Sequence, residues 1–157
     1  MRPFIDSHLD LAWNALSFNR DLRMTVEELR RFERYMTDEP ARGRNTLTFP
    51  ELRRANMPVC VATLMARSGP DQARPNGTKR TDLDYASQAI AHAHARGQLA
   101  YYRLLEEQGI VRFITNREQL ADHWKAYAQA PETTPLGIIL SMERADPIVD
   151  PEQVQAW

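Results

Sequence analysis

Four short apolar segments, separated by stretches with helical periodicity, limit the folds open to this chain. The segments read PFIDSHLD, PVCVATLM, IVRFIT and LGIILSM, and each has the length of a strand and is rich in Val, Ile, Leu or Phe. Nearly continuous apolar strands that alternate with helices are typical of α/β folds with a parallel sheet. We therefore predict a single α/β domain over residues 1–157, with four parallel strands in sequential order.

The stretches between these segments carry recognisable helix signals. Thr25 and Glu28 form a capping box that opens a helix with Leu29 and Phe32 on its inner side. The longest predicted helix covers about residues 82–108 and stops at a glycine, and a further helix begins at Asn116. The irregular stretch ARSGPDQARPNGTKR between two of the strands is expected to be a solvated loop, with a substrate-facing lid as the alternative.

Polar residues lie at the end of the first apolar segment. Asp6, His8 and Asp10 occupy alternate positions, and alternate residues of a strand share one face. The carboxyl end of a strand is where α/β folds place their chemistry. An imidazole nitrogen and a carboxylate oxygen suit zinc or a similar divalent ion, so His8 and Asp10 are candidate ligands. A hydrogen-bonded or solvated strand end has the same pattern and stays an alternative.

A second candidate ligand follows the fourth apolar segment. LGIILSMERADPI is a buried strand that continues directly into Glu143, where a carboxylate is unfavourable unless water, a partner or a metal receives it. If the strands are parallel, Glu143 lies at the same edge of the sheet as His8 and Asp10. Its two oxygens could bridge two metal ions. We predict that these three side chains converge.

The two motifs together resemble one family. IDSHLDLAWNAL and GIILSMERADPI are similar to segments of the membrane dipeptidase (renal dipeptidase) family, zinc metallopeptidases of the amidohydrolase-like (β/α)8 TIM-type barrels. The resemblance implies that His8 and Asp10 bind one zinc ion and that Glu143 is the catalytic ligand that bridges two. It also implies that Trp13 lies near the substrate pocket. The chain would then form the N-terminal portion of such a barrel, truncated at its C-terminus after about four strands.

The sequence departs from this family in two respects. Arg144 stands where the family has Gly after the bridging Glu. The two histidine ligands of the second zinc, the substrate-contacting His and Arg, and the acid–base Asp have no matching positions. His92, His94 and His123 lie in predicted helices and are expected to be solvated or packing residues rather than replacements for those ligands, while Cys60 is expected to be an inert core thiol.

The activity implied by the resemblance is hydrolysis of a dipeptide by a metal-bridging hydroxide. With the ligand set incomplete, we expect the chain alone to bind zinc weakly and to lack this activity. Two alternatives remain: a sibling amidohydrolase that acts on another small amide or ester, and a non-catalytic half-barrel that serves as an assembly module. Half a barrel leaves sheet edges and apolar strand faces exposed to water. We therefore expect the chain to form a homo-oligomer or to associate with the missing C-terminal half.

The composition bears on partners and location. Lys and Arg total 20 against 21 Asp and Glu, so the net charge of −1 offers no electrostatic basis for binding nucleic acid or an anionic membrane. No apolar run approaches the ~18 residues of a membrane span, and no signal-peptide pattern is found. The single cysteine excludes an internal disulfide and favours a reducing compartment. We expect a cytoplasmic protein.

Overall fold

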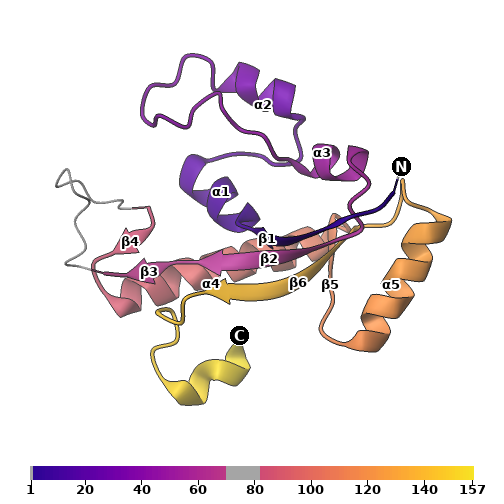
Figure 1. Ribbon diagram of the computed structural model, residues 1–157. Coiled ribbons are helices and arrows are strands. Elements are labelled where there is room, and N and C mark those ends of the chain that lie inside the picture. Colours follow the sequence, from indigo (N-terminus) through magenta and orange to yellow (C-terminus); the bar gives the residue numbers. More distant parts are fainter. Residues whose placement is uncertain (1, 70–81) are drawn as a thin grey trace.

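The chain forms an α/β structure around a parallel sheet. The structure is a computed structural model and describes residues 2–69 and 82–157 (Figure 1). Its main sheet contains β1 (Ile5–Leu9), β2 (Val59–Met65), β5 (Val111–Phe113) and β6 (Leu136–Glu143), all parallel. A separate parallel pair consists of β3 (Arg67–Ser68) and β4 (Asp84–Tyr85). The prediction of an α/β fold with a four-stranded parallel sheet is confirmed.

The order of the strands differs from the prediction. The sheet runs β1-β2-β6-β5, so the third of these strands in sequence lies at the edge, beyond the fourth, and the expectation of sequential order is wrong. β2 and β6 pair over their full seven-residue register, whereas β5 pairs with β6 over only three positions. Placing the two long apolar strands side by side satisfies more backbone hydrogen bonds than separating them with a three-residue strand.

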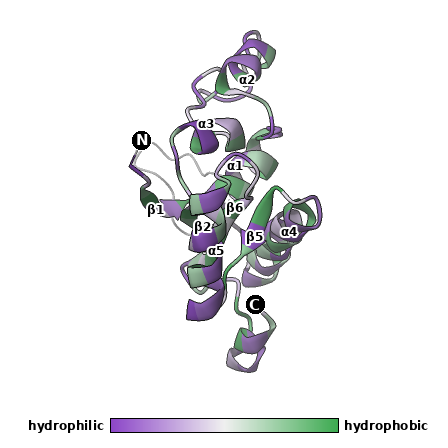
Figure 2. Cartoon of the chain, turned by 90° about the vertical axis from the view of Figure 1, so that its right-hand side faces the viewer, coloured by the Kyte–Doolittle hydropathy of each residue, from purple (hydrophilic) through white to green (hydrophobic). Residues whose placement is uncertain are grey.

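Helices lie on both faces of the sheet. α1 (Leu11–Phe18) and α4 (Gln88–Glu107) pack against each other and against β2, where they cover Cys60, Ala62 and Leu64. α5 (Arg117–Gln129) packs on the other face, near the amino ends of the strands. Its His123 ring lies so close to Gly137 of β6 that a Cβ on this glycine would be only 2.7 Å from the ring. Figure 2 shows α4 and α5 on opposite flanks of the strands. On the face of the sheet that packs against α5, the carboxyl half, which contains Val61 and Ile139, is only partly covered.

The local helix signals are largely confirmed. The capping box of Thr25 and Glu28 opens α2 (Val26–Phe32), and Asn116 caps α5. α2 ends so early that Leu29 is buried while Phe32 is exposed, contrary to the predicted inner side. α4 ends before Gly109 (φ +69°), but it begins at Gln88, because part of the predicted first turn forms β4.

Short elements complete the described chain. α3 (Phe49–Arg54) precedes β2, and a 3-10 helix (Pro151–Ala156) follows the cap residue Asp150. Within residues 2–69 and 82–157, no helix is both long and apolar enough to cross a membrane. Of the predicted loop over residues 66–80, positions 67–68 form β3, and the part from residue 70 lies outside the described residues.

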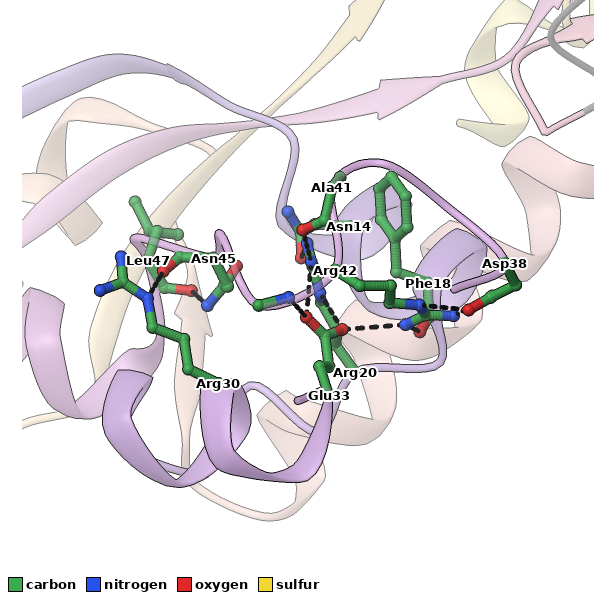
Figure 3. Close-up of polar contacts among 11 residues, drawn as sticks. Asn14, Phe18, Arg20, Arg30, Glu33, Asp38, Ala41, Arg42, Asn45 and Leu47 are labelled. Atoms are coloured by element: carbon green, nitrogen blue, oxygen red, sulfur yellow. Dashed lines mark hydrogen bonds and ion pairs between the residues drawn. The ribbon is translucent and has the colours of Figure 1, made fainter. Parts of the chain in front are cut away.

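A buried ion cluster holds the long connection between α1 and α3. We call Arg20, Glu33 and Arg42 the Glu33 cluster (Figure 3). Both Glu33 oxygens bind the Arg20 guanidinium, at 2.7 and 2.9 Å, and they also accept from Arg42 Nη1 and the Gly43 amide, each at 2.8 Å. Burial alone would raise the pKa of Glu33, but these hydrogen bonds lower it to about 2. The cluster therefore carries a carboxylate that is ionised at neutral pH inside the protein.

Candidate metal centre

Three side chains from distant parts of the sequence meet at the carboxyl edge of the sheet. We call His8, Asp10 and Glu143 the triad. His8 Nε2 lies 3.4 Å from Asp10 Oδ1 and 3.2 Å from Glu143 Oε2, and one donor atom of each residue lies within 4.8 Å of the others. The predicted convergence of these residues is confirmed. Their role as metal ligands stays a prediction.

A bulge in β1 turns Asp6 to a different face of the sheet from His8. The register pairs Asp6 with Cys60 and Leu9 with Ala62, so three steps along β1 match two steps along β2. Asp6 therefore shares the face of Cys60, and its Oδ1 accepts a hydrogen bond of 2.9 Å from the His8 amide. The expectation that Asp6, His8 and Asp10 line one face is wrong for Asp6, because the extra residue changes the alternation.

Asp10 lies at the junction of β1 and α1. Its carbonyl accepts from the Asn14 amide at 2.9 Å, in the first turn of α1, while its carboxylate does not cap the helix. The Oδ1 atom instead accepts a hydrogen bond from the hydroxyl of Thr63, a buried residue of β2. Thr63 was not among the predicted site residues, and its one signal in the sequence is a hydroxyl residue within an otherwise apolar strand.

Glu143 is the last residue of β6 and pairs with Met65 of β2. It therefore lies on the face opposite the α1–α4 core, at the end of the sheet that α5 does not cover. The side chains of His8, Asp10 and Glu143 are 53%, 27% and 30% exposed. Solvent consequently reaches all three, and a ligand could approach them without rearrangement of the core.

The donor set and its spacing fit a divalent cation. Ligands at the usual Zn–N and Zn–O distances of a tetrahedral site are separated from one another by about 3.3 Å. The observed separations of 3.2 and 3.4 Å match this value. Three protein donors would leave a position for water or substrate, as catalytic zinc sites do. An imidazolium held between two carboxylates has the same spacing, and a metal titration separates the two arrangements.

Arg144, the residue that departs from the family pattern, has an unusual backbone conformation. Its φ is +66°, in the left-handed region that favours glycine. A glycine would adopt this backbone conformation without strain. The Arg144 side chain lies beside Asp146, with Nε 3.1 Å from Oδ2.

Trp13 lies in α1, one turn after Asp10. Its indole nitrogen donates to the Asp82 carbonyl at 3.1 Å, and its ring packs edge-to-face on Phe18 with centroids 5.2 Å apart. The hydrogen bond attaches α1 to the chain that leads into β4, and the ring contact lies within α1. The expected position near a substrate stays a prediction, since these two contacts concern packing.

The other histidines do not join the triad. His92 Nδ1 lies 2.8 Å from the Pro147 carbonyl, His94 stacks on Tyr85 at 4.0 Å, and His123 Nε2 lies 2.9 Å from the Pro58 carbonyl. These are packing and hydrogen-bonding roles, as predicted. Cys60 is fully buried, and burial raises the pKa of its thiol to about 12, which agrees with an inert core residue.

A groove formed by described residues lies at the opposite end of the sheet. It has a volume of about 1140 Å³ and lies between α3 and α5, beside the amino ends of the strands, where Met57, Ile110 and Leu136 contribute to its wall. The triad is not part of it. The triad is therefore an open surface site within the described chain, and its chemistry depends on its ligands rather than on an enclosing cavity.

Comparison with known proteins adds no assignment: no family model and no curated protein matches this sequence. The resemblance to dipeptidases consequently depends on the two motifs around His8 and Glu143 alone.

Proposed function

We propose that this chain provides a zinc site and a metal-bridging carboxylate for the hydrolysis of dipeptides. The supporting observation is the triad itself, which joins residues from opposite ends of the sequence. His8 Nε2 lies 3.4 Å from Asp10 Oδ1 and 3.2 Å from Glu143 Oε2, and the three donor atoms lie within 4.8 Å of one another, an arrangement that fits zinc. A structural ion pair would need no such combination at the carboxyl edge of a parallel sheet, which is the usual location of α/β active sites.

Each residue of the triad has a distinct task in this proposal. His8 and Asp10 hold one ion, and Glu143 contributes one oxygen to that ion and leaves the second for a neighbouring ion. A bound zinc ion supplies an activated water and polarises the scissile carbonyl. The exposure of the triad leaves room for a small substrate, and Trp13, one turn from Asp10, would border it.

The proposal predicts weak metal binding and no turnover by the chain alone. The ligands of the second zinc, and the acid–base Asp that the resemblance implies, have no matching positions. One histidine and two carboxylates leave much of the coordination to water. The location that we propose is the cytoplasm, on the basis of the single buried thiol, Cys60.

The barrel is the part of the proposal with the least structural support. A portion of a (β/α)8 barrel would place β5 between β2 and β6 and all helices on one side, whereas here β5 is at the edge and α5 lies on the face opposite α1 and α4. The metal-site proposal does not depend on this, because carboxyl ends of parallel strands meet at one edge in either architecture. A sibling amidohydrolase would use the same triad.

The assembly module is the second candidate, and the partly covered sheet face favours it. Val61 and Ile139 are paired residues on the face of the sheet against which α5 packs. They lie beyond the end of the area that α5 covers, and both are half-buried. An apolar surface of this kind is commonly covered by another chain or domain. Sedimentation would support this role if it showed a defined oligomer, and a monodisperse monomer would contradict it.

A metal titration tests the main proposal. The apoprotein is titrated with Co²⁺, followed by visible absorbance, and then with Zn²⁺ as a competitor. We expect one class of site that Glu143→Ala and His8→Ala abolish, while Glu107→Ala, an exposed glutamate at the end of α4, leaves it intact. Absence of binding, or binding that survives Glu143→Ala, would contradict the proposal. Metal-dependent dipeptide hydrolysis that Glu143→Ala abolishes would show that the chain is sufficient for catalysis.

A further inference from the structure

Asp10 has a hydrogen-bond partner that the metal-site proposal does not use. Thr63 Oγ1 contacts Asp10 Oδ1 and also lies 3.3 Å from the Leu9 carbonyl. A hydroxyl has one proton to donate, and a carboxylate is a stronger acceptor than a backbone carbonyl. The proton is therefore directed to Asp10. Thr63 is almost fully buried, so water does not compete for this bond.

Thr63 is in turn held by a buried hydroxyl of α4. Tyr102 Oη donates to the Thr63 carbonyl at 3.2 Å and accepts from the Ala12 amide at 3.0 Å. Tyr102 is completely buried, and burial raises the pKa of its phenol, so it remains a neutral donor. This single hydroxyl connects β2 to the first turn of α1. Asp10 contacts both elements, because it precedes α1 directly and accepts a hydrogen bond from Thr63 of β2.

We infer that Thr63 is a positioning residue for Asp10 in the metal site. Its hydroxyl takes one acceptor site of Oδ1, the oxygen that lies 3.4 Å from His8 Nε2. The second site of Oδ1, and Oδ2, which makes no hydrogen bond within residues 2–69 and 82–157, stay available to a cation. A carboxylate held by a buried donor loses little rotational freedom when it binds a metal. Partners of this kind commonly raise metal affinity about 10–100-fold. The inference rests on the proposed function, because it assumes that the triad binds a metal ion.

The test compares Zn²⁺ affinity, measured by competition with Co²⁺, in three variants of the full chain. Thr63→Val removes the hydroxyl at nearly constant volume and is expected to weaken affinity about 10–100-fold. Thr63→Ser keeps the hydroxyl and is expected to retain the wild-type affinity. Thr48→Val is the matched control, because Thr48 is buried, its hydroxyl has no partner within the described residues, and it lies at the start of α3, away from the triad.

Folding is monitored in parallel by the urea midpoint of each apoprotein. A structural role alone would lower the midpoint of Thr63→Val without changing the affinity of the folded protein. Should Thr63→Val fail to fold, Thr63→Ala, which also lacks the hydroxyl, replaces it, again with weakened affinity expected. Unchanged affinity in the valine or alanine variant, or an equally weak Thr63→Ser, would overturn the inference while the metal site stands. Absence of metal binding by the wild type would overturn both.

Discussion

The protein contains two groups of charged side chains that differ in environment and in pairing. In the Glu33 cluster the carboxylate side chain is only 1% exposed, and four donors from Arg20, Arg42 and Gly43 satisfy its two oxygens. In the triad, two carboxylates share one imidazole, and all three side chains are substantially exposed. The first group is closed and its negative charge is compensated, while the second is open and rich in acceptors.

This difference separates a structural site from a candidate functional one. A buried ion with a full set of partners specifies one geometry, and loss of one partner leaves an uncompensated charge in the interior. Exposed ions contribute little to stability and remain available to a ligand. We therefore expect the Glu33 cluster to maintain the segment between α1 and α3, and the triad to be dispensable for folding. Paired substitutions can test this distinction.

The largest expected effect is that of Glu33→Gln. It removes the negative charge between two guanidinium groups and should lower the free energy of unfolding by about 3–5 kcal/mol. Urea denaturation measures the loss. The control is Asp38→Asn, an exposed partner of Arg42, which should cost less than about 1 kcal/mol. Equal small losses in both variants would show that the cluster is not a closed structural unit.

Acid should weaken the same cluster. The pKa of Glu33 is about 2 in the folded protein and 4.5 without its partners, so the folded state binds fewer protons between these values. The stabilisation is complete above pH 4.5 and is lost as the pH falls from 4.5 through 2, by up to about 3 kcal/mol. Unfolding curves across this range check the prediction. Glu33→Gln should flatten the slope, and an unchanged slope would assign the effect to other carboxylates.

Beside the triad, Arg144→Gly should stabilise the protein slightly. Glycine relieves the left-handed backbone of Arg144, a gain of about 1–2 kcal/mol that is partly offset by the greater flexibility of glycine in the unfolded chain. We expect a net gain below about 1 kcal/mol in thermal or urea denaturation. Arg144→Gln removes the charge but keeps the strained backbone and should not stabilise. A gain in the glutamine variant would indicate that charge, and not the backbone, destabilises this position.

The smallest expected change in stability is that of Glu143→Gln, which is chemically identical to the substitution in the Glu33 cluster. Because the Glu143 side chain is 30% exposed and His8 is its one ion-pair partner among the described residues, the free energy of unfolding should change by about 0.5 kcal/mol or less. Metal binding should nevertheless be lost, because an amide is a much poorer ligand than a carboxylate. A loss of several kcal/mol in the apoprotein would instead show that the triad is a structural ion pair.

Local signals in the sequence determined much of the secondary structure. The capping box of Thr25 and Glu28, the Asn116 cap and the stop at Gly109 act over a few residues, and each appears in the structure as predicted. The convergence of His8, Asp10 and Glu143 also followed from the sequence, because parallel strands bring their carboxyl ends to one edge. That conclusion required only the direction of the strands.

Contacts between distant segments decided what the sequence could not determine. The position of β5 at the edge depends on the competition of strands for partners, and the direction of Asp6 depends on a bulge relative to β2. Tertiary packing also buried Glu33 between two arginines and joined Thr63 to Asp10 through side chains that lie 53 positions apart. Local propensity cannot encode such contacts, because their energy arises only after the strands and helices have come together.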